Sequence, residues 1–371
     1  MNIRFWLLTL MTAAVLAGCS SGDGSKELEA GKNAYGLRDL VKAAKCFEKC
    51  LELAPDNVDA LVYLARTKLE VGELEASGAA VRRALNLEPQ AVDARLLAAQ
   101  LAWHAKDYER AYETYHALAA DDKLDASVRS QAWTGLGIVE VMREEPHLAR
   151  LAYLRAIRLD RRNAAAWYHL GRLYRDGLGY LEAALEQFEF YVRIEKDADV
   201  KVQKVQRSVI PALKQSLNTA LMQRPGVAKR DSAAASDAIA RGEAAVKKGA
   251  YKTAKKEYET ALAADPISYP AALGLARTLE RIDAKAALEK YRLACQLSPS
   301  AVSTYVHTGT LAAKLGMHGI AEMVFSRAVA ANPASLDALD GLIRALRKNG
   351  KPKLAQAYQQ YRDTLPVRKR K

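Results

Sequence analysis

The sequence predicts an all-α protein, a solenoid of repeated helix pairs, and three observations favour this fold. Half of the 371 residues are apolar and only 7% are aromatic, a composition that suits the packing of helices through small side chains. No run of alternating β-branched residues, the mark of a half-buried strand, occurs along the chain. A pattern of glycine, alanine, aromatic and proline residues recurs about every 34 residues, and this period predicts a stack of helix–turn–helix units.

The stretch Ala235–Pro266 shows the repeated unit most completely. Its apolar positions predict two amphipathic helices of about three turns each, joined by a tight turn at Lys248-Gly249. Glycine at position 242 lets the two helices approach closely, and glycine in the turn supplies a left-handed residue. The recurring positions of the unit are Gly242, Gly249, Tyr251, Ala254, Tyr258, Ala261 and Pro266.

These offsets resemble those of the tetratricopeptide repeat family, and the resemblance covers residues 24–197 and 235–365. It implies a right-handed superhelical α-solenoid of about nine units. In this family the first helices of successive units line a concave face, on which segments of partner proteins bind. The resemblance therefore implies a binding protein, without naming its partner.

The repeat pattern divides the chain into two arrays. A first array of about five repeats is predicted at 27–197 and a second of about four at 237–365, followed by a basic tail at 366–371. The fifth unit carries one inserted residue and the seventh is one residue short in its turn. Between the arrays, an apolar stripe predicts a closing helix at 198–222, bent near Pro211, and the RPG sequence predicts a linker or hinge at 223–236.

The first 18 residues read as a signal peptide rather than as part of the fold. Arg4 is followed by an apolar run of 13 residues up to Ala17, which is shorter than the roughly 20 residues that span a bilayer. Leu16, Ala17, Gly18 and Cys19 resemble a bacterial lipobox, which implies that Cys19 is lipidated and that 19–26 forms a tether. We expect a lipoprotein of the outer membrane that faces the periplasm. The alternative is an ordinary signal peptide with a chance cysteine.

Charge is distributed unevenly along the chain. The formal net charge is +13; residues 19–197 hold 25 Lys/Arg and 29 Asp/Glu, whereas residues 198–371 hold 30 and 14. We expect an anionic partner to prefer the second half.

The sequence offers no catalytic or metal-binding motif. Cys46 and Cys50 lie four residues apart with no further ligand near them in sequence, and packing explains them. The glycine-rich Asp176–Gly179 stretch lacks the lysine and the preceding strand of a phosphate loop. No metal-ligand spacing relates the histidines, which are His104, His116, His147, His169, His307 and His318. We expect no enzyme activity, no metal and no cofactor.

A binding surface is the remaining candidate site. The first helices carry a broken row of basic and aromatic residues that would line the concave face: Lys32, Arg66, Trp103, Tyr168, Arg172, Arg175, Arg277, Arg281, Arg344 and Arg347. A second basic surface is predicted at Lys247, Lys248, Lys255 and Lys256. The alternative, that these are merely solvated faces of amphipathic helices, stays open. The lysine positions of the family's carboxylate clamp hold residues such as Leu28 and Val62, so a clamp is not supported.

We therefore expect a non-catalytic scaffold, anchored by lipid, that holds protein partners of an envelope assembly such as a pilus, secretion, barrel or polysaccharide-export machine. One alternative is a binder of an anionic polysaccharide or lipid surface through the basic half. Another is a docking regulator of peptidoglycan hydrolases. We expect no nucleic acid partner, because an exported lipoprotein rarely meets one.

Overall fold

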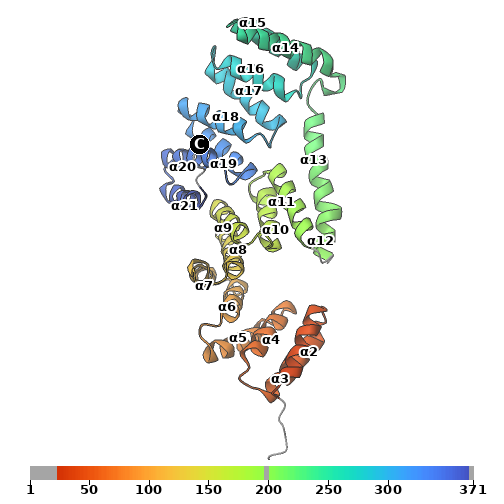
Figure 1. The fold of residues 1–371 in the computed structure, drawn as a ribbon, viewed down its shortest axis with the longest axis vertical. Helices are drawn as coiled ribbons and strands as arrows, with labels where there is room; N and C mark the ends of the chain where they lie inside the picture. Colours follow the sequence, from red (N-terminus) through yellow and green to blue (C-terminus); the bar gives the residue numbers. More distant parts are fainter. Residues whose placement is uncertain (1–22, 196–199, 367–371) are drawn as a thin grey trace, which may run out of the picture. The chain divides into compact units, whose positions relative to one another are not determined.

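The computed structural model describes residues 23–195 and 200–366, and these residues form helices and no strands (Figure 1). Nine helix pairs follow one another within them, so the predicted all-α architecture of repeated helix pairs is confirmed. The chain divides into two compact units, with the boundary between Val128 and Arg129. The predicted lipobox and the residues of the basic tail after Pro366 lie outside the described residues.

The first unit contains three helix pairs. Their bounds are α2 Ser25–Gly36, α3 Leu40–Leu53, α4 Val58–Glu70, α5 Leu74–Leu87, α6 Val92–His104 and α7 Tyr108–Ala120. Because α2 begins at Ser25, the last residues of the predicted tether 19–26 already belong to the fold.

The second unit contains six pairs and a long connecting helix. Its first pairs are α8 Ala126–Met142 with α9 Pro146–Leu159, and α10 Ala164–Arg172 with α11 Leu181–Ile194. The connection consists of α12 Val200–Lys204, η2 Val205–Val209 and α13 Ile210–Met222. The last four pairs are α14 Ser232–Lys247, α15 Tyr251–Ala264, α16 Tyr269–Leu279, α17 Ala284–Leu297, α18 Val302–Lys314, α19 His318–Ala331, α20 Leu336–Lys348 and α21 Pro352–Asp363.

In several helix pairs, an aromatic ring of the second helix packs against a glycine of the first helix. A Cβ atom added to Gly31 of α2 would lie only 2.5 Å from the ring of Phe47, whose side chain is completely buried. The same relation joins Gly309 of α18 to Phe325 of α19, where the distance would be 2.8 Å. Protein interiors tolerate no such overlap, so the absence of a side chain at these positions sets how closely the two helices pack.

The two irregular units predicted from the sequence have visible structural consequences. In the fifth pair, a π-helical turn, η1 Leu173–Gly177, lies between α10 and α11 and accommodates the inserted residue. In the seventh pair the turn between α16 and α17 lacks the residue of positive φ that other pairs have, for example Gly249 and Gly316. Both changes in length, one residue more in the fifth pair and one fewer in the seventh, therefore lie between the two helices of the pair and leave the helices themselves intact.

The segment after the fifth pair differs partly from its prediction. Its apolar stripe is confirmed, because Val202, Val205 and Leu213 are buried, and α13 packs against α11. Near Pro211, where the sequence predicts a bend, the helix contains a π-helical turn, η2. This turn ends two residues before Pro211, which has no backbone N–H to donate a hydrogen bond.

The linker predicted at 223–236 is shorter than expected and is tied to the helices that follow it. Asp231 caps α14, accepting hydrogen bonds from the backbone of Ala233 (3.1 Å) and Ala234 (3.0 Å), so α14 already begins at Ser232. Val227 is buried, and the backbone N–H of Asp231 donates to the carbonyl of Ala264 at 2.8 Å. The sequence did not indicate the bond from Asp231 to Ala264, because it joins residues far apart in the chain.

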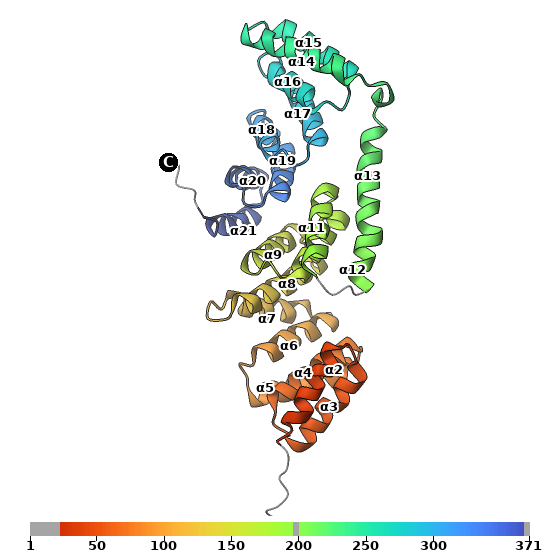
Figure 2. The same ribbon diagram turned by 45° about the vertical axis from the view of Figure 1, so that its right-hand side comes forward.

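Within the second unit, the last helix pair returns to contact the first (Figure 2). Arg150 of α9 is completely buried, and its Nε donates to Tyr358 Oη of α21 at 2.9 Å. Its Nη1 donates to the carbonyl and to Oγ of Ser326 in α19, at 3.0 Å each. The charge has phenols rather than carboxylates around it, and burial raises the pKa of Tyr358 well above its usual range.

This contact explains why the boundary between the units does not coincide with the predicted linker. An isolated buried cation costs several kcal/mol, so its donors must all find acceptors. Ser326 and Tyr358 supply acceptors, which fixes α9 against α19 and α21. A second contact is made by Arg158 of α9, whose Nη1 donates to Thr364 Oγ1 at 3.0 Å. The fourth and fifth pairs, predicted as the end of the first array, therefore pack with the second array.

We expect Arg150→Ala to lower the free energy of unfolding of the second unit by about 2–4 kcal/mol, because it leaves a cavity and unpaired buried hydroxyls. The double variant Arg150→Met with Tyr358→Phe replaces the whole polar contact by apolar side chains and should recover most of that loss. Urea denaturation followed by the fluorescence of Trp167 measures both. Equal loss in the single and double variants would contradict this account of the contact.

Candidate partner-binding surface

Each predicted cation of the first unit lies near a carboxylate of its own helix or of a neighbouring helix. Lys32 Nζ lies 3.2 Å from Glu29 and 3.9 Å from Asp59, and Arg66 Nη2 lies 3.0 Å from Asp93. Both cations also lie over the ring of Tyr63, at 5.4 and 5.7 Å from its centroid. Their charge is therefore balanced within the fold.

The two aromatic residues of the predicted row are half-buried. Trp103 of α6 has a buried Nε1 with no hydrogen-bond partner. Tyr168 of α10 lies beneath Lys201, whose Nζ is 3.9 Å from the ring centroid, and its ring also contacts those of Phe188 and Tyr191. Tyr168 therefore belongs to the packing around α11 and α12 rather than to an open surface.

Arg172 and Arg175 share one carboxylate. Arg175 Nε lies 2.6 Å from Asp176 and Arg172 Nε lies 3.7 Å from it. The hydrogen bond from Arg175 lowers the pKa of Asp176, so the carboxylate is charged at neutral pH. The cations predicted on the first five pairs are thus all paired.

The cations predicted on the last four pairs are not paired in this way. Arg277, Arg281, Arg344 and Arg347 are exposed, and none has a carboxylate within 4.0 Å in the part of the chain that the structure describes. The carboxylates nearest to them in sequence are already engaged. Glu280 accepts a hydrogen bond from Tyr291 Oη at 2.9 Å and lies 3.1 Å from His307 Nε2. Asp340 lies 3.0 Å from Arg362 Nε.

Most lysines of the basic surface predicted on α14 and α15 are likewise exposed and unpaired. Lys247, Lys248 and Lys256 are exposed without an ion pair among the described residues, and Lys255 has a long contact of 3.8 Å to Glu259. The structure therefore divides the predicted basic residues into a paired set, on the first five pairs, and a largely unpaired set, on the last four.

Two pockets that the sequence did not predict lie where α10 and α11 meet the last helix pairs. The larger, of about 510 Å³, is apolar and contains the stacked rings of Trp167 and Phe190, whose centroids are 4.7 Å apart. Arg158, Arg161 and Leu365 also line it.

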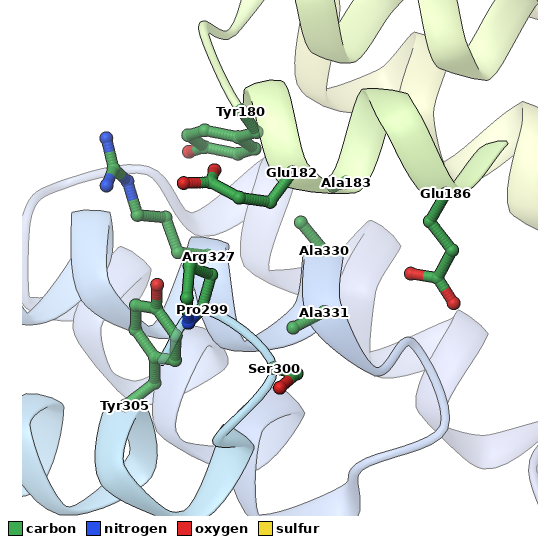
Figure 3. Close-up of a pocket in the computed structure, with 10 residues that line it drawn as sticks. All are labelled: Tyr180, Glu182, Ala183, Glu186, Pro299, Ser300, Tyr305, Arg327, Ala330 and Ala331. Carbon is green, nitrogen blue, oxygen red and sulfur yellow. The ribbon is translucent and has the colours of Figure 1, made fainter. Parts of the chain in front are cut away.

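The smaller pocket, of about 220 Å³, is drawn in Figure 3. Tyr180, Glu182 and Glu186 reach it from one side, and Tyr305 and Arg327 from the other. Burial, and then the nearby Glu189, raise the pKa of Glu186. The two sides of the pocket come from segments more than 100 residues apart in sequence, so the repeat period did not indicate it.

The described residues offer no constellation for metal chemistry. No three of their His, Cys, Asp or Glu side chains are grouped so that they could hold an ion. Cys46, Cys50 and Cys295 are unpaired thiols, and burial raises the pKa of Cys50 and Cys295, the latter to about 11, which keeps both protonated. None of the described helices is both long and apolar enough to cross a membrane.

Two curated proteins show partial similarity to this chain. It is 26% identical over 147 residues to Superkiller protein 3 of Schizosaccharomyces pombe, covering 40% of this chain and 8% of that protein. It is 28% identical over 148 residues to the Protein O-mannosyl-transferase TMTC3 of Mus musculus, covering 37% and 16%. The chain thus spans less than a fifth of the curated relatives that it matches.

Among solved structures, a thermophilic tetratricopeptide-repeat protein of Thermus thermophilus, TTC0263, is 19% identical, with a TM-score of 0.45 and coverage of 52% of this chain and 99% of that one. Family models described as tetratricopeptide repeats match residues 29–57, 46–78, 64–127 and 239–302. These matches fall in both units and overlap helix pairs of the structure. The chain therefore contains tetratricopeptide repeats.

Proposed function

We propose that this protein is a non-catalytic scaffold that holds one or more protein partners on the first helices of its last four repeats. Tetratricopeptide repeats bind protein partners, which supports this class of function. Four exposed arginines without an ion pair among the described residues are the main support for it: Arg277, Arg281, Arg344 and Arg347. Cations without internal partners keep their full interaction energy for a binding partner, whereas Lys32 and Arg66 would first have to break an ion pair.

The proposal extends to location and partner class. The lipobox-like Leu16–Cys19 supports a lipid anchor on Cys19 in the outer membrane of a bacterium, facing the periplasm. Two or three acyl chains would hold the protein durably, since each buried methylene contributes about 0.8 kcal/mol. The partners would then belong to an envelope machine for pili, secretion, barrel insertion or polysaccharide export. A peptidoglycan hydrolase that docks on the same surface would be a partner of the same kind.

We expect partner capture to depend on the unpaired arginines. In intact cells, chemical crosslinking and affinity purification of the tagged full chain should recover a defined partner. The variant Arg277→Ala, Arg281→Ala, Arg344→Ala and Arg347→Ala should recover it at least about fivefold less, because rim charges guide and hold charged partners. A matched control replaces Lys252, Lys256, Lys285 and Lys353, exposed lysines of second helices, by Ala. Recovery of abundant bystanders alone from wild-type cells would overturn the scaffold.

We expect Cys19→Ser to release the protein from the membrane fraction, because the serine hydroxyl cannot receive the thioether-linked lipid. Cell fractionation and mass spectrometry of the mature N-terminus measure this, and Cys46→Ser serves as the control. A Cys19→Ser protein that stays in the membrane fraction with an unmodified N-terminus would contradict lipidation.

A second candidate is direct binding of an anionic polysaccharide or lipid surface, favoured by the unpaired Lys247, Lys248 and Lys256. Exposed charges are screened beyond about 8–10 Å at physiological ionic strength, so such binding should fall steeply with salt. We expect co-sedimentation with an acidic polysaccharide or anionic vesicles to be lost above about 0.5 M salt, and in the variant that replaces all four lysines 247, 248, 255 and 256 by Glu. Binding that persists in 1 M salt would exclude this mechanism.

A further inference from the structure

A second row of cations lies one helical turn beyond the ninth residue of each of the last four repeats. Its members are Lys247, Arg281, Lys314 and Lys348, separated by 34, 33 and 34 residues. Lys247, Lys314 and Lys348 are the last residues of α14, α18 and α20, and Arg281 follows the end of α16 by two residues. All four are exposed. We call these four residues the terminal row.

The first five repeats do not share this feature. Their matching residues are Gly36, Glu70, His104, Met142 and Asp176. A cation in the last turn of a helix is favourable on its own, because it interacts with the negative end of the helix dipole. That effect would apply equally to all nine first helices, so it does not explain a row confined to four consecutive repeats.

The terminal row has no internal counter-charge. No carboxylate lies within 4.0 Å of any of its four cations in the described residues. Carboxylates elsewhere in these repeats are engaged: Glu280 with Tyr291 and His307, and Glu322 with Lys351 at 2.8 Å. Three exposed carboxylates of the first helices are not engaged in this way: Asp237 and Glu243 of α14 and Asp337 of α20. None of them lies within 4.0 Å of a terminal-row cation.

The four cations belong to first helices that are neighbours within the second unit. α14 contacts α16 and α18 contacts α20, and Glu280 with His307 at 3.1 Å joins α16 to α18. The succession of these helices is visible in Figure 2. Packed helices lie about 8–10 Å apart, so the terminal row presents charges at intervals of about 10 Å.

We propose that the terminal row binds an extended acidic segment of a protein partner, with a carboxylate at every third residue. A polyproline II strand rises about 3.1 Å per residue and turns once in three residues. Its every third side chain therefore points the same way, at a spacing of about 9 Å that matches the row. This inference rests on the proposed scaffold function and specifies the chemistry of the partner.

The probe is a fluorescent peptide of about 18 residues with Glu at every third position and Pro and Ala between. Its control is an isomer of the same composition with all glutamates at one end. In about 0.15 M salt, fluorescence anisotropy with the purified full chain should show at least about fivefold tighter binding of the spaced peptide. Because exposed ion pairs are individually weak, four must be changed together: Lys247→Glu, Arg281→Glu, Lys314→Glu and Lys348→Glu should weaken binding at least about tenfold.

The matched control changes four lysines of the second helices that belong to neither basic surface: Lys252→Glu, Lys285→Glu, Lys290→Glu and Lys353→Glu. It alters net charge equally and should weaken binding less than about threefold. Equal weakening by both variants would show that the peptide responds to net charge alone, and would contradict the terminal row as its binding site. Equal affinity for the two peptides would contradict the proposed match between the row and carboxylates at every third residue. Tighter, row-dependent binding of an acidic polysaccharide or of anionic vesicles would overturn the choice of a polypeptide.

Failure here can be told apart from failure of the scaffold function. If the charge-reversed row still captures the wild-type partner in cells, the scaffold stands and the row is not its binding site. If the spaced peptide binds the row but cells yield no defined partner, the row is a binding site and the scaffold function is wrong.

Discussion

The structure depends on one packing constraint: no helix pair in this chain can bury its apolar face alone. Phe47 reaches full burial only because Gly31 opposite it has no side chain, and Phe325 uses Gly309 in the same way. Each pair must then stack on the next. On some first helices the stacking leaves one face uncovered, as the exposed Arg277 of α16 and Arg344 of α20 show.

Electrostatics distinguishes the uncovered faces. In the first five repeats, each predicted cation has an acidic neighbour, such as Asp93 for Arg66 and Asp176 for Arg175. In the last four, Arg277 and Arg344 have none among the described residues. A paired arginine gains little from a new carboxylate, because it exchanges one ion pair for another, whereas an unpaired one gains the whole interaction. Among the basic residues predicted for the concave face, the exposed and unpaired ones therefore belong to the last four repeats.

The sequence predicted what depends on local spacing. Helix pairs, the inserted residue absorbed at Leu173–Gly177 and the irregular helix before Pro211 all follow from periods and from proline and glycine chemistry. It did not predict contacts between distant residues. The period does not indicate which cations find a carboxylate on the next helix, and it cannot show that Arg150 meets Tyr358, 208 residues away. For the same reason the sequence did not show that the linker is tied to α15, where the carbonyl of Ala264 accepts a hydrogen bond from the backbone N–H of Asp231.

The central claim, that the first helices of the last four repeats form the partner-binding face, can be tested by lysine footprinting. A membrane-permeable amine-acylating reagent would be applied to intact cells and to the purified chain, with modification read by mass spectrometry. We predict that Lys314 and Lys348, on first helices, react at least about fivefold more slowly in cells than in the purified chain, while Lys252 and Lys285, on second helices, react equally in both. Unchanged reactivity of all four lysines between cells and the purified chain would contradict it.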